Sequence, residues 1–448
     1  MHLEQGEVID EIITKIRAGR MTRRTFLERA IAVGLSSTAA VSLLEACGGT
    51  SNSSTGGGQT VNINFAVKDQ NGVWAGLVNT FNAQNNGVHV TYNSNFPNDT
   101  GQQLTILTTM LRARGSSIDV MQMDIIWPPE FGANGWTVPL DDKWPASERA
   151  NYLPGPLAGC TYNGKLWAAP IYTDVGVIYY RKDIISTPPN TWNDLKTMAN
   201  AAIAGSKTKT GYLWQGAQYE GLVCDFCEVL YGYGGNVLDP NNPKSVIVNS
   251  PEGVAALTQM VNWVGTISPS AITTYKEEDA RSSWQNGDAA FMRNWPYAYS
   301  LGNDPSSSKI AGKFDIHPML YGGSNTTGHS NIGGWQHGIN AFSKNPDAAW
   351  KFIHYMLGST PQKTLAMQLS LLATLKSIYT DSDVLAKVPF FAKVPSIVQN
   401  GLPRPVSPFY PDISNAIQVR IHSALTKGST PTDALSGLQS DLQAIVNK

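Results

Sequence analysis

Alternation of apolar and polar residues in the early part of the chain predicts a β-α-β unit. Residues 61–67 alternate, as expected of a half-buried strand. Residues 74–81 instead carry apolar side chains at helical spacing, and residues 88–92 alternate again. This order of elements is typical of α/β folds in which helices pack on a parallel sheet.

Later patterns extend this prediction along the chain. Residues 118–123 predict a strand that ends at Asp124, and residues 175–180 predict another. Helices are predicted over 347–357 and, behind the capping sequence 430–433, near the end of the chain. Ligands bind α/β folds at the carboxyl ends of parallel strands. Asp124 is therefore a candidate ligand contact, and a cap for the following helix is the alternative.

The first part of the chain has the layout of an export signal. Arg23 and Arg24 stand before the small, apolar stretch 30–44, as in twin-arginine signals. A membrane-spanning helix needs about 20 apolar residues, which that stretch does not supply. The sequence leading to Cys47 resembles a lipoprotein cleavage box. We therefore expect residues 1–46 to be a removed signal and Cys47 to be lipidated.

A flexible tether is predicted to follow the lipidated cysteine. Residues 47–60 are rich in Gly and Ser and have no means of packing. The protein is expected to be exported and held by its lipid on the outer face of the cytoplasmic membrane. Translation from Met1 and translation from Met21 both fit this interpretation.

Composition narrows the class of ligand. The chain has 33 Lys and Arg against 34 Asp and Glu, and this balance argues against nucleic acid as a partner because a nucleic-acid binder shows a basic stripe. Only 15% of residues are charged, whereas Trp occurs 12 times. Most Trp residues belong to cores, but this combination suits a ligand with apolar faces and many hydroxyls, such as a sugar.

Three cysteines besides Cys47 remain for an oxidising compartment. Cys224 and Cys227 have the spacing of a redox pair, but they fall in a predicted helix and lack the βαβ setting of such a site. A catalytic pair is therefore disfavoured. A disulfide from Cys160 to one of the two and no disulfide at all are both open.

Motifs spread over nearly the whole chain after the leader agree in order and spacing with one family. They include Ile118 to Asp124, Gly135-Trp136, Ala169 to Gly176, Trp214-Gln215-Gly216, Arg293 to Ala298, Gly333-Gly334-Trp335 and Arg404 to Pro411. In these segments the chain resembles extracellular solute-binding proteins of family 1, the sugar receptors of ABC importers, and most closely the trehalose/maltose-binding branch.

The resemblance implies a fold and a function. The fold is α/β, a two-lobed periplasmic-binding-protein fold of type II, in which each lobe is a mostly parallel sheet flanked by helices. Lobe 1 would comprise 61–171 and 315–372, and lobe 2 would comprise 172–314 and 373–448. The protein would be a monomer that binds an α-linked disaccharide or short oligosaccharide between the lobes and delivers it to a membrane permease, without cofactor or metal.

Two carboxylates and an arginine match polar ligand contacts of the family. Asp124 and Asp174 would accept hydrogen bonds from sugar hydroxyls, because a carboxylate offers two oxygens to adjacent hydroxyls. Asp174 interrupts an apolar strand, so its carboxyl must be paired or solvated. Arg404 would donate its fork of N–H groups to the sugar; bracing an interface between the lobes is the alternative.

Aromatic and glycine positions complete the site that the resemblance implies. Trp295 and Trp335 match the platforms on which a pyranose stacks, and Tyr172 matches a polar aromatic beside the carboxylate. Gly334 would let the backbone approach the ligand. Glu220 is a further candidate, open between a ligand contact and a helix cap.

Two departures and two rivals limit this interpretation. Gln103 stands where close relatives carry an arginine, and the loop 68–72 is shorter, so the second sugar ring or the linkage is expected to differ. A secreted glycosidase would also pair two carboxylates with aromatic residues, but no other catalytic motif is present. A glycerophosphodiester receptor of the same fold should carry more cations than Arg404.

Overall fold

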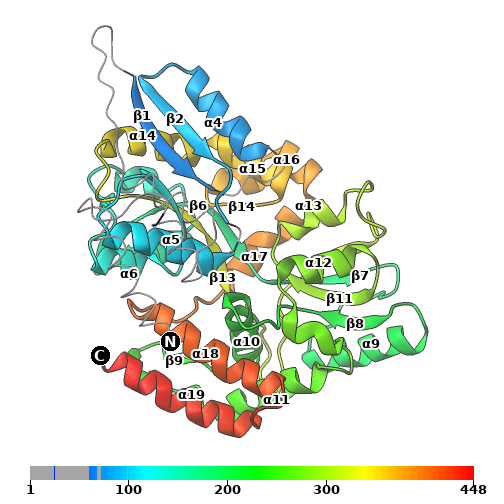
Figure 1. The fold of residues 1–448 in the computed structure, drawn as a ribbon. Coiled ribbons are helices and arrows are strands. Elements are labelled where there is room, and N and C mark those ends of the chain that lie inside the picture. The colour runs from blue at the N-terminus through cyan, green and yellow to red at the C-terminus, as the bar shows by residue number, and fades with distance from the viewer. Residues whose placement is uncertain (1–24, 26–59, 68–71, 98) are drawn as a thin grey trace.

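The computed structural model describes Thr25 and residues 60–67, 72–97 and 99–448 (Figure 1). Apart from Thr25, the predicted signal lies outside these residues, as do Cys47, the tether up to residue 59 and most of the first loop. Within the described part of the chain, no helix has both the length and the apolar character required to cross a membrane.

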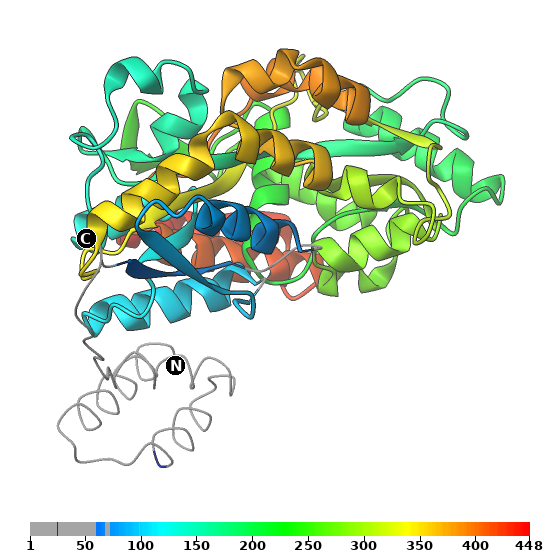
Figure 2. The same cartoon turned by 90° about the horizontal axis from the view of Figure 1, so that it is seen from above.

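Lobe 1 is built on a six-stranded sheet. Its strands, in spatial order, are β14 (Leu372–Ala373), β6 (Ala169–Val175), β13 (Ile332–Ile339), β3 (Val120–Asp124), β1 (Val61–Ala66) and β2 (Val88–Asn93). The main helices of this lobe are α4 (Val73–Ala83), α5 (Thr100–Arg112), α6 (Pro128–Ala133), α14 (Pro346–Leu357) and α15 (Ser359–Leu369). Figure 2 shows α14 and α15 in yellow beside β1 and α4 in blue. All of these elements except β14 share one apolar core, and β14 packs with the core of lobe 2.

Lobe 2 is built on a four-stranded sheet with a separate core. Its strands, in spatial order, are β12 (Phe314–His317), β7 (Val177–Arg181), β11 (Ala289–Asn294) and β8 (Thr210–Leu213). The main helices are α9 (Trp192–Ala204), α10 (Glu220–Gly232), α11 (Pro251–Trp263), α12 (Glu277–Gln285), α18 (Tyr410–Leu425) and α19 (Pro431–Val446). They lie in the half of Figure 1 that holds the carboxyl end of the chain.

The elements predicted from periodicity are confirmed. The expected β-α-β unit is β1, α4 and β2, and the strand that ends at Asp124 is β3. The predicted helices correspond to α14 and α19, and the hydroxyl of Thr430 caps α19 by accepting a hydrogen bond from the N–H of Asp433 at 3.2 Å. Local pattern is sufficient here because each element buries one face against a core.

Strand directions differ from the expectation of mostly parallel sheets, although the two-lobed fold is confirmed. β1 runs parallel to β2 and β3, whereas β13 runs antiparallel to β3 and β6. In lobe 2, β7 is antiparallel to both of its neighbours. Each sheet is mixed because the strand that enters it from a crossing, β13 in lobe 1 and β7 in lobe 2, runs antiparallel to both of its neighbours.

The crossings lie at different residues from the expected lobe boundaries. The sheet changes at Gly176, between β6 and β7, and again between His317 and Ile332, and the chain crosses a third time between β14 and α18. The boundaries expected at 171, 315 and 372 therefore fall inside β6, β12 and β14. Strand alternation continues through Gly176 in the sequence, which is why residues 175–180 were predicted as one strand.

Candidate ligand cleft

A cavity of about 370 Å³ lies between the two lobes. This volume is within the usual range for small-molecule sites, about 300–1,000 Å³. The structure brings all the predicted sugar-binding residues to its lining: Gln103, Asp124, Tyr172, Asp174, Glu220, Trp295, Gly334, Trp335 and Arg404. Their contact with a sugar stays a prediction, but their convergence from widely separated segments is a property of the fold.

Strand register explains why three of these residues meet. Trp335 on β13 pairs with Asp124 on β3 and with Tyr172 on β6, so the three side chains stand in one row across adjacent strands. Gly333 pairs in the same way with Asp174. A motif on one strand is thus placed beside motifs that lie far away in the sequence.

Arg404 forms an ion pair across the cleft. Its Nη2 donates to Asp124 Oδ1 of lobe 1 at 3.1 Å, and its Nη1 donates to Glu220 Oε1 of lobe 2 at 2.6 Å. Glu220 also accepts hydrogen bonds from the hydroxyls of Tyr410 and Ser414. Protein donors therefore occupy both oxygens of Glu220, which favours a role in holding Arg404. The bracing role that the sequence left open for Arg404 is present in the structure.

The two aspartates of the cleft, Asp124 and Asp174, both have raised pKa values. Burial raises the pKa of Asp124, although the neighbouring Arg404 charge opposes this shift. Burial also raises the pKa of Asp174 well above its ordinary value, and the Asp124 charge adds to the increase while Arg293 opposes it. Both groups are buried close to each other, so a ligand that donates hydrogen bonds to them would stabilise their ionised forms.

Two buried acceptors that line the cavity have no partner among the described residues. They are Asp174 Oδ1 and Gln103 Oε1, whose residues are 8% and 2% exposed. The amide nitrogen of Gln103 donates to the carbonyl of Pro97 at 2.7 Å, which fixes that side chain. Buried acceptors are nearly always satisfied in native proteins. Hydroxyl groups of a ligand would supply the missing donors.

The aromatic side chains are held by different contacts. Trp295 follows β11; the Cζ of Arg293 lies 3.9 Å from its ring centroid, and its Nε1 donates to Glu277 Oε1 at 3.4 Å. Trp335 is half-buried and packs edge-on against Trp127 with 5.9 Å between ring centroids. Both rings line the cavity, as stacking on a sugar requires.

Glycine is required at position 334 for a structural reason, which differs from the expected close approach of the backbone to a ligand. Its φ of +127° disfavours any side chain, and a Cβ there would lie 2.5 Å from the carbonyl oxygen of Tyr172. The pairing of β13 with β6 shifts register immediately afterwards. The residue does line the cavity, but close contact between two strands is what requires glycine.

Sequence reasoning missed a second group of lining residues, on the lobe 2 side and at the rim. The hydroxyl of Tyr219 donates to Glu277 Oε2 at 2.7 Å, and the ammonium group of Lys276 lies 2.6 Å from Asp99 of lobe 1. Tyr297 is also part of the lining. Tyr297 belongs to the family motif Arg293 to Ala298, but it was not singled out as a ligand contact. No motif marks Lys276 or Glu277, because a charged stretch before a helix is ordinarily a solvated end.

The three described cysteines form no disulfide with one another. Cys160, Cys224 and Cys227 are free and buried, and burial raises the pKa of the Cys227 thiol to about 12. Cys224 lines the cavity as a neutral thiol on α10, the helix predicted for this pair. The part of the chain that the structure describes also contains no cluster of His, Cys, Asp and Glu suited to a metal.

Comparisons with known proteins agree with this architecture. The model of the bacterial extracellular solute-binding protein family matches residues 67–363. A probable ABC transporter-binding protein of Deinococcus radiodurans is 38% identical over 362 residues, which cover 78% of this chain and 85% of the relative.

Solved structures give the same result in three dimensions. The maltose-bound MalE3 of T. maritima superposes with a TM-score of 0.81 at 35% identity, over 86% of this chain and 99% of that chain. A solute-binding protein of Agrobacterium radiobacter K84 in complex with ribitol has a TM-score of 0.77 at 26% identity, over 86% and 99% of the two chains. On these matches, the chain belongs to the bacterial extracellular solute-binding protein family.

Proposed function

We propose that this protein is the receptor of an ABC importer and that it binds an α-linked disaccharide or short oligosaccharide of the maltose or trehalose type. The observation that carries the proposal is the interlobe cavity, in which buried carboxyl groups and two tryptophan rings converge. Carboxylates accept bonds from sugar hydroxyls, and aromatic rings cover the C–H faces of a pyranose. A monomeric receptor would release this sugar to the permease when the lobes open.

The relatives support a polyhydroxylated ligand. MalE3 of T. maritima carries maltose, and the Agrobacterium protein carries ribitol. Both ligands present many hydroxyl groups to a cleft of this fold. The relative from Deinococcus radiodurans supports the transporter assignment, because it is described as a probable ABC transporter-binding protein.

The cations of the cleft favour a neutral sugar over a phosphodiester. Lys276 and Arg404 are the basic residues of the described lining, and each already contacts carboxylates. A phosphate group would need basic donors that are available for it, whereas these are engaged.

Calorimetric titration with trehalose, maltose, sucrose, palatinose and ribitol tests the proposal. We expect micromolar affinity for an α-linked disaccharide, about −8 kcal/mol, and no change of that sugar during incubation. Failure to bind any of the sugars would contradict the receptor assignment. Release of glucose from a bound disaccharide would instead support a glycosidase.

We further propose that Cys47 anchors the receptor through lipid and that residues 47–60 act as its tether. The twin-arginine pattern and the cleavage box support this proposal. Expression of Cys47→Ala alongside the wild-type chain would test it by mass spectrometry of the mature amino terminus and by membrane fractionation. The wild-type chain should carry acyl mass and sediment with membranes, whereas the variant should be soluble; equal fractionation would argue against the anchor.

A further inference from the structure

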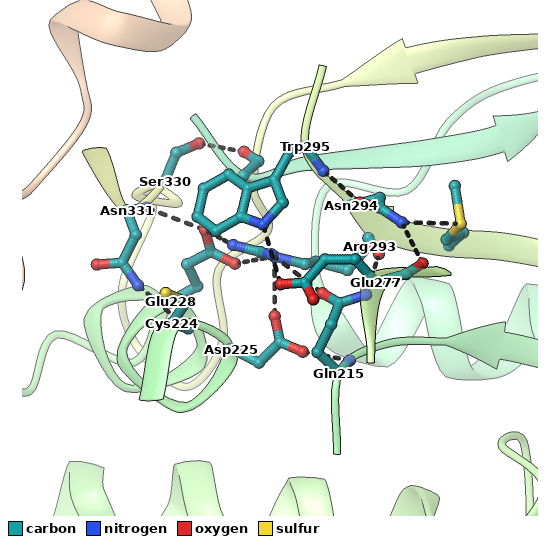
Figure 3. A network of polar contacts seen from close by, with 12 residues as sticks. Gln215, Cys224, Asp225, Glu228, Glu277, Arg293, Asn294, Trp295, Ser330 and Asn331 are labelled. Carbon is teal, nitrogen blue, oxygen red and sulfur yellow. Dashed lines mark hydrogen bonds and ion pairs between the residues drawn. The ribbon is translucent and has the colours of Figure 1, made fainter. Parts of the chain in front are cut away.

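A buried ionic cluster lies in lobe 2 directly behind the cleft (Figure 3). Arg293 on β11 is 1% exposed and makes a two-pronged ion pair with Glu228 of α10, with Nε at 2.7 Å and Nη2 at 2.8 Å from the carboxylate oxygens. Its Nε also lies 2.8 Å from Asp225 Oδ1, and its Nη1 donates to Gln215 Oε1 at 3.0 Å. Apolar packing could fill such a space without the cost of desolvating charges, so the cluster needs another explanation.

The first link of the cluster is to the aromatic platform. The guanidinium carbon of Arg293 lies 3.9 Å from the centroid of the Trp295 ring. Figure 3 shows the two side chains next to each other. A cation stacked on one face of a tryptophan fixes the orientation of the ring and contributes cation–π attraction. The guanidinium group cannot rotate, because Glu228 and Gln215 hold its other donors.

The second link is to the first two segments that cross between the lobes, at Gly176 and between His317 and Ile332. Glu228 Oε1 accepts the backbone N–H of Asn331 at 3.0 Å, in the segment that returns to lobe 1. The other crossing passes the same group, since a Cβ on Gly176 would lie 1.8 Å from Glu228 Oε1 and 2.6 Å from Arg293 Nη2. Ser330 then joins the two crossings by donating to the carbonyl of Gly176 at 2.7 Å. The first and second crossing segments are therefore packed on the Arg293–Glu228 pair.

The third link is to the carboxyl group of Asp174, on the strand that leads into Gly176. The Arg293 charge lowers the pKa of Asp174, opposing burial and the Asp124 charge. Arg404 is the cation that pairs with Asp124. Each cleft aspartate thus has its own arginine, one that reaches it directly and one that acts on it from behind the cleft.

We propose that Arg293 is a positioning residue for ligand binding: it fixes the Trp295 ring and, through Glu228, ties that ring to the first two segments that cross between the lobes. The inference rests on the proposed function, since it concerns how the sugar site is held. Arg293 needs no contact with the sugar for this role. Its loss should change affinity and its pH dependence together.

Arg293→Met, Arg293→Lys and the control Arg181→Met test the proposal in the full chain. Arg181 suits the control because it makes a two-pronged pair with Asp183 at the far end of β7 and does not line the cavity. We expect Arg293→Met to bind the preferred disaccharide at least about 30-fold more weakly, from lost ring orientation and lost charge. Arg181→Met should stay within about threefold of wild type, because its pair is remote from the cleft.

The pH dependence separates positioning from a purely structural role. Without Arg293, the Asp174 carboxyl keeps its proton to higher pH. The fall in sugar affinity at acid pH, here called the acid limb, should therefore begin at a higher pH in Arg293→Met than in wild type. Arg293→Lys retains the charge and should restore that limb while leaving affinity reduced. Tryptophan fluorescence should show an altered environment of Trp295 in both Arg293 variants and an unchanged one in the control.

Two variants keep the test decisive if Arg293→Met does not fold. Arg293→Lys and Glu228→Gln both retain hydrogen-bonding groups at the cluster, and thermal unfolding would confirm that they are native. If wild type binds sugar and these variants bind it as well as Arg181→Met, with the same acid limb, the inference is wrong and the proposed function stands. If wild type binds none of the sugars, the proposed function is wrong and the inference falls with it.

Discussion

Among the residues that the structure describes, two ion pairs join the lobes across the cleft, and they differ in how much water reaches them. The side chains of Arg404 and Asp124 are 2% and 10% exposed, whereas those of Lys276 and Asp99 are 47% and 27% exposed. The rim pair is the shorter, at 2.6 Å against 3.1 Å. The N–O distance therefore does not show which ion pair contributes more to stability. Water screens the rim pair and can replace its contacts, whereas water does not reach the buried pair.

The contacts that support the two ion pairs also differ, because the buried pair is held more firmly than the rim pair. Arg404 is held by Glu220, which is itself held by Tyr410 and Ser414. Lys276 lies 5.0 Å from the centroid of the Tyr219 ring and has a mobile aliphatic stem. A braced pair suits the fixed centre of a binding site, and an exposed pair can separate at small cost when a cleft opens. The comparison predicts effects of very different size.

Loss of the deep pair should have the largest effect. Arg404→Met leaves Asp124 and Glu220 buried without their cation, which typically costs about 3–5 kcal/mol. We expect sugar affinity to fall at least about 100-fold, because the remaining carboxylates lose both orientation and charge balance. Calorimetric titration and denaturant unfolding would measure the two losses.

Arg420→Met is the matched control for that substitution. Arg420 pairs with Asp441 between α18 and α19, where both side chains are about 40% exposed. It should change unfolding free energy by no more than about 1 kcal/mol and leave affinity unaltered. Equal effects of the two substitutions would refute the distinction between buried and exposed pairs.

Asp174→Asn should weaken binding but stabilise the free protein. The folded pKa of Asp174 is raised above the unfolded value, so the folded state holds its proton to higher pH than the unfolded chain. This carboxyl consequently costs no stability below about pH 4 and costs progressively more as pH rises through the folded pKa. The amide removes that cost, which should add about 1 kcal/mol at pH 7, while affinity falls about tenfold.

Unfolding curves of Asp174→Asn and wild type at pH 3.5 and pH 7 would check the sign. The variants should coincide at the lower pH and separate at the higher one. A wild type that is the more stable protein at pH 7 would show that Asp174 is satisfied within the free protein. The equivalent change at the exposed Asp412 serves as the control, since its partner is the exposed Lys448.

Glu220→Gln tests whether the contact of Glu220 with Arg404 supports sugar binding through its charge or through its geometry. The amide oxygen can still accept from Arg404, but the hydroxyls of Tyr410 and Ser414 compete for the remaining positions. We expect affinity to fall by about threefold to tenfold, since a charge-assisted bond becomes a neutral one. A loss as large as that of Arg404→Met would mean that Glu220 contacts the sugar itself.

The sequence predicted the deep part of the cleft far better than its rim. Asp124 ends a strand that the sequence pattern predicts, whereas Tyr172 and Trp335 lie inside strands and belong to motifs that carry the family resemblance. The pairing of β13 with β3 and β6 brings the three residues together. Lys276 and Asp99 meet only because the lobes approach each other, and that approach depends on the crossings. The first crossing was expected at residue 171 and lies at Gly176, because strand alternation passes through Gly176 without a break. Local pattern therefore fixes which elements form, whereas contacts between lobes depend on long-range packing.

Lys276→Met should give the smallest effect and the strongest dependence on salt. Removal of the exposed pair should weaken sugar binding by only about twofold to threefold at low ionic strength. The difference from wild type should disappear near 1 M salt, where the Debye length falls to about 3 Å. Calorimetric titration at two salt concentrations would measure this, with Lys363→Met as a control because its partners Asp381 and Asp383 lie outside the cleft. A large loss that persists in salt would place Lys276 with Arg404, as a group whose role is to hold the ligand and not merely to close the rim.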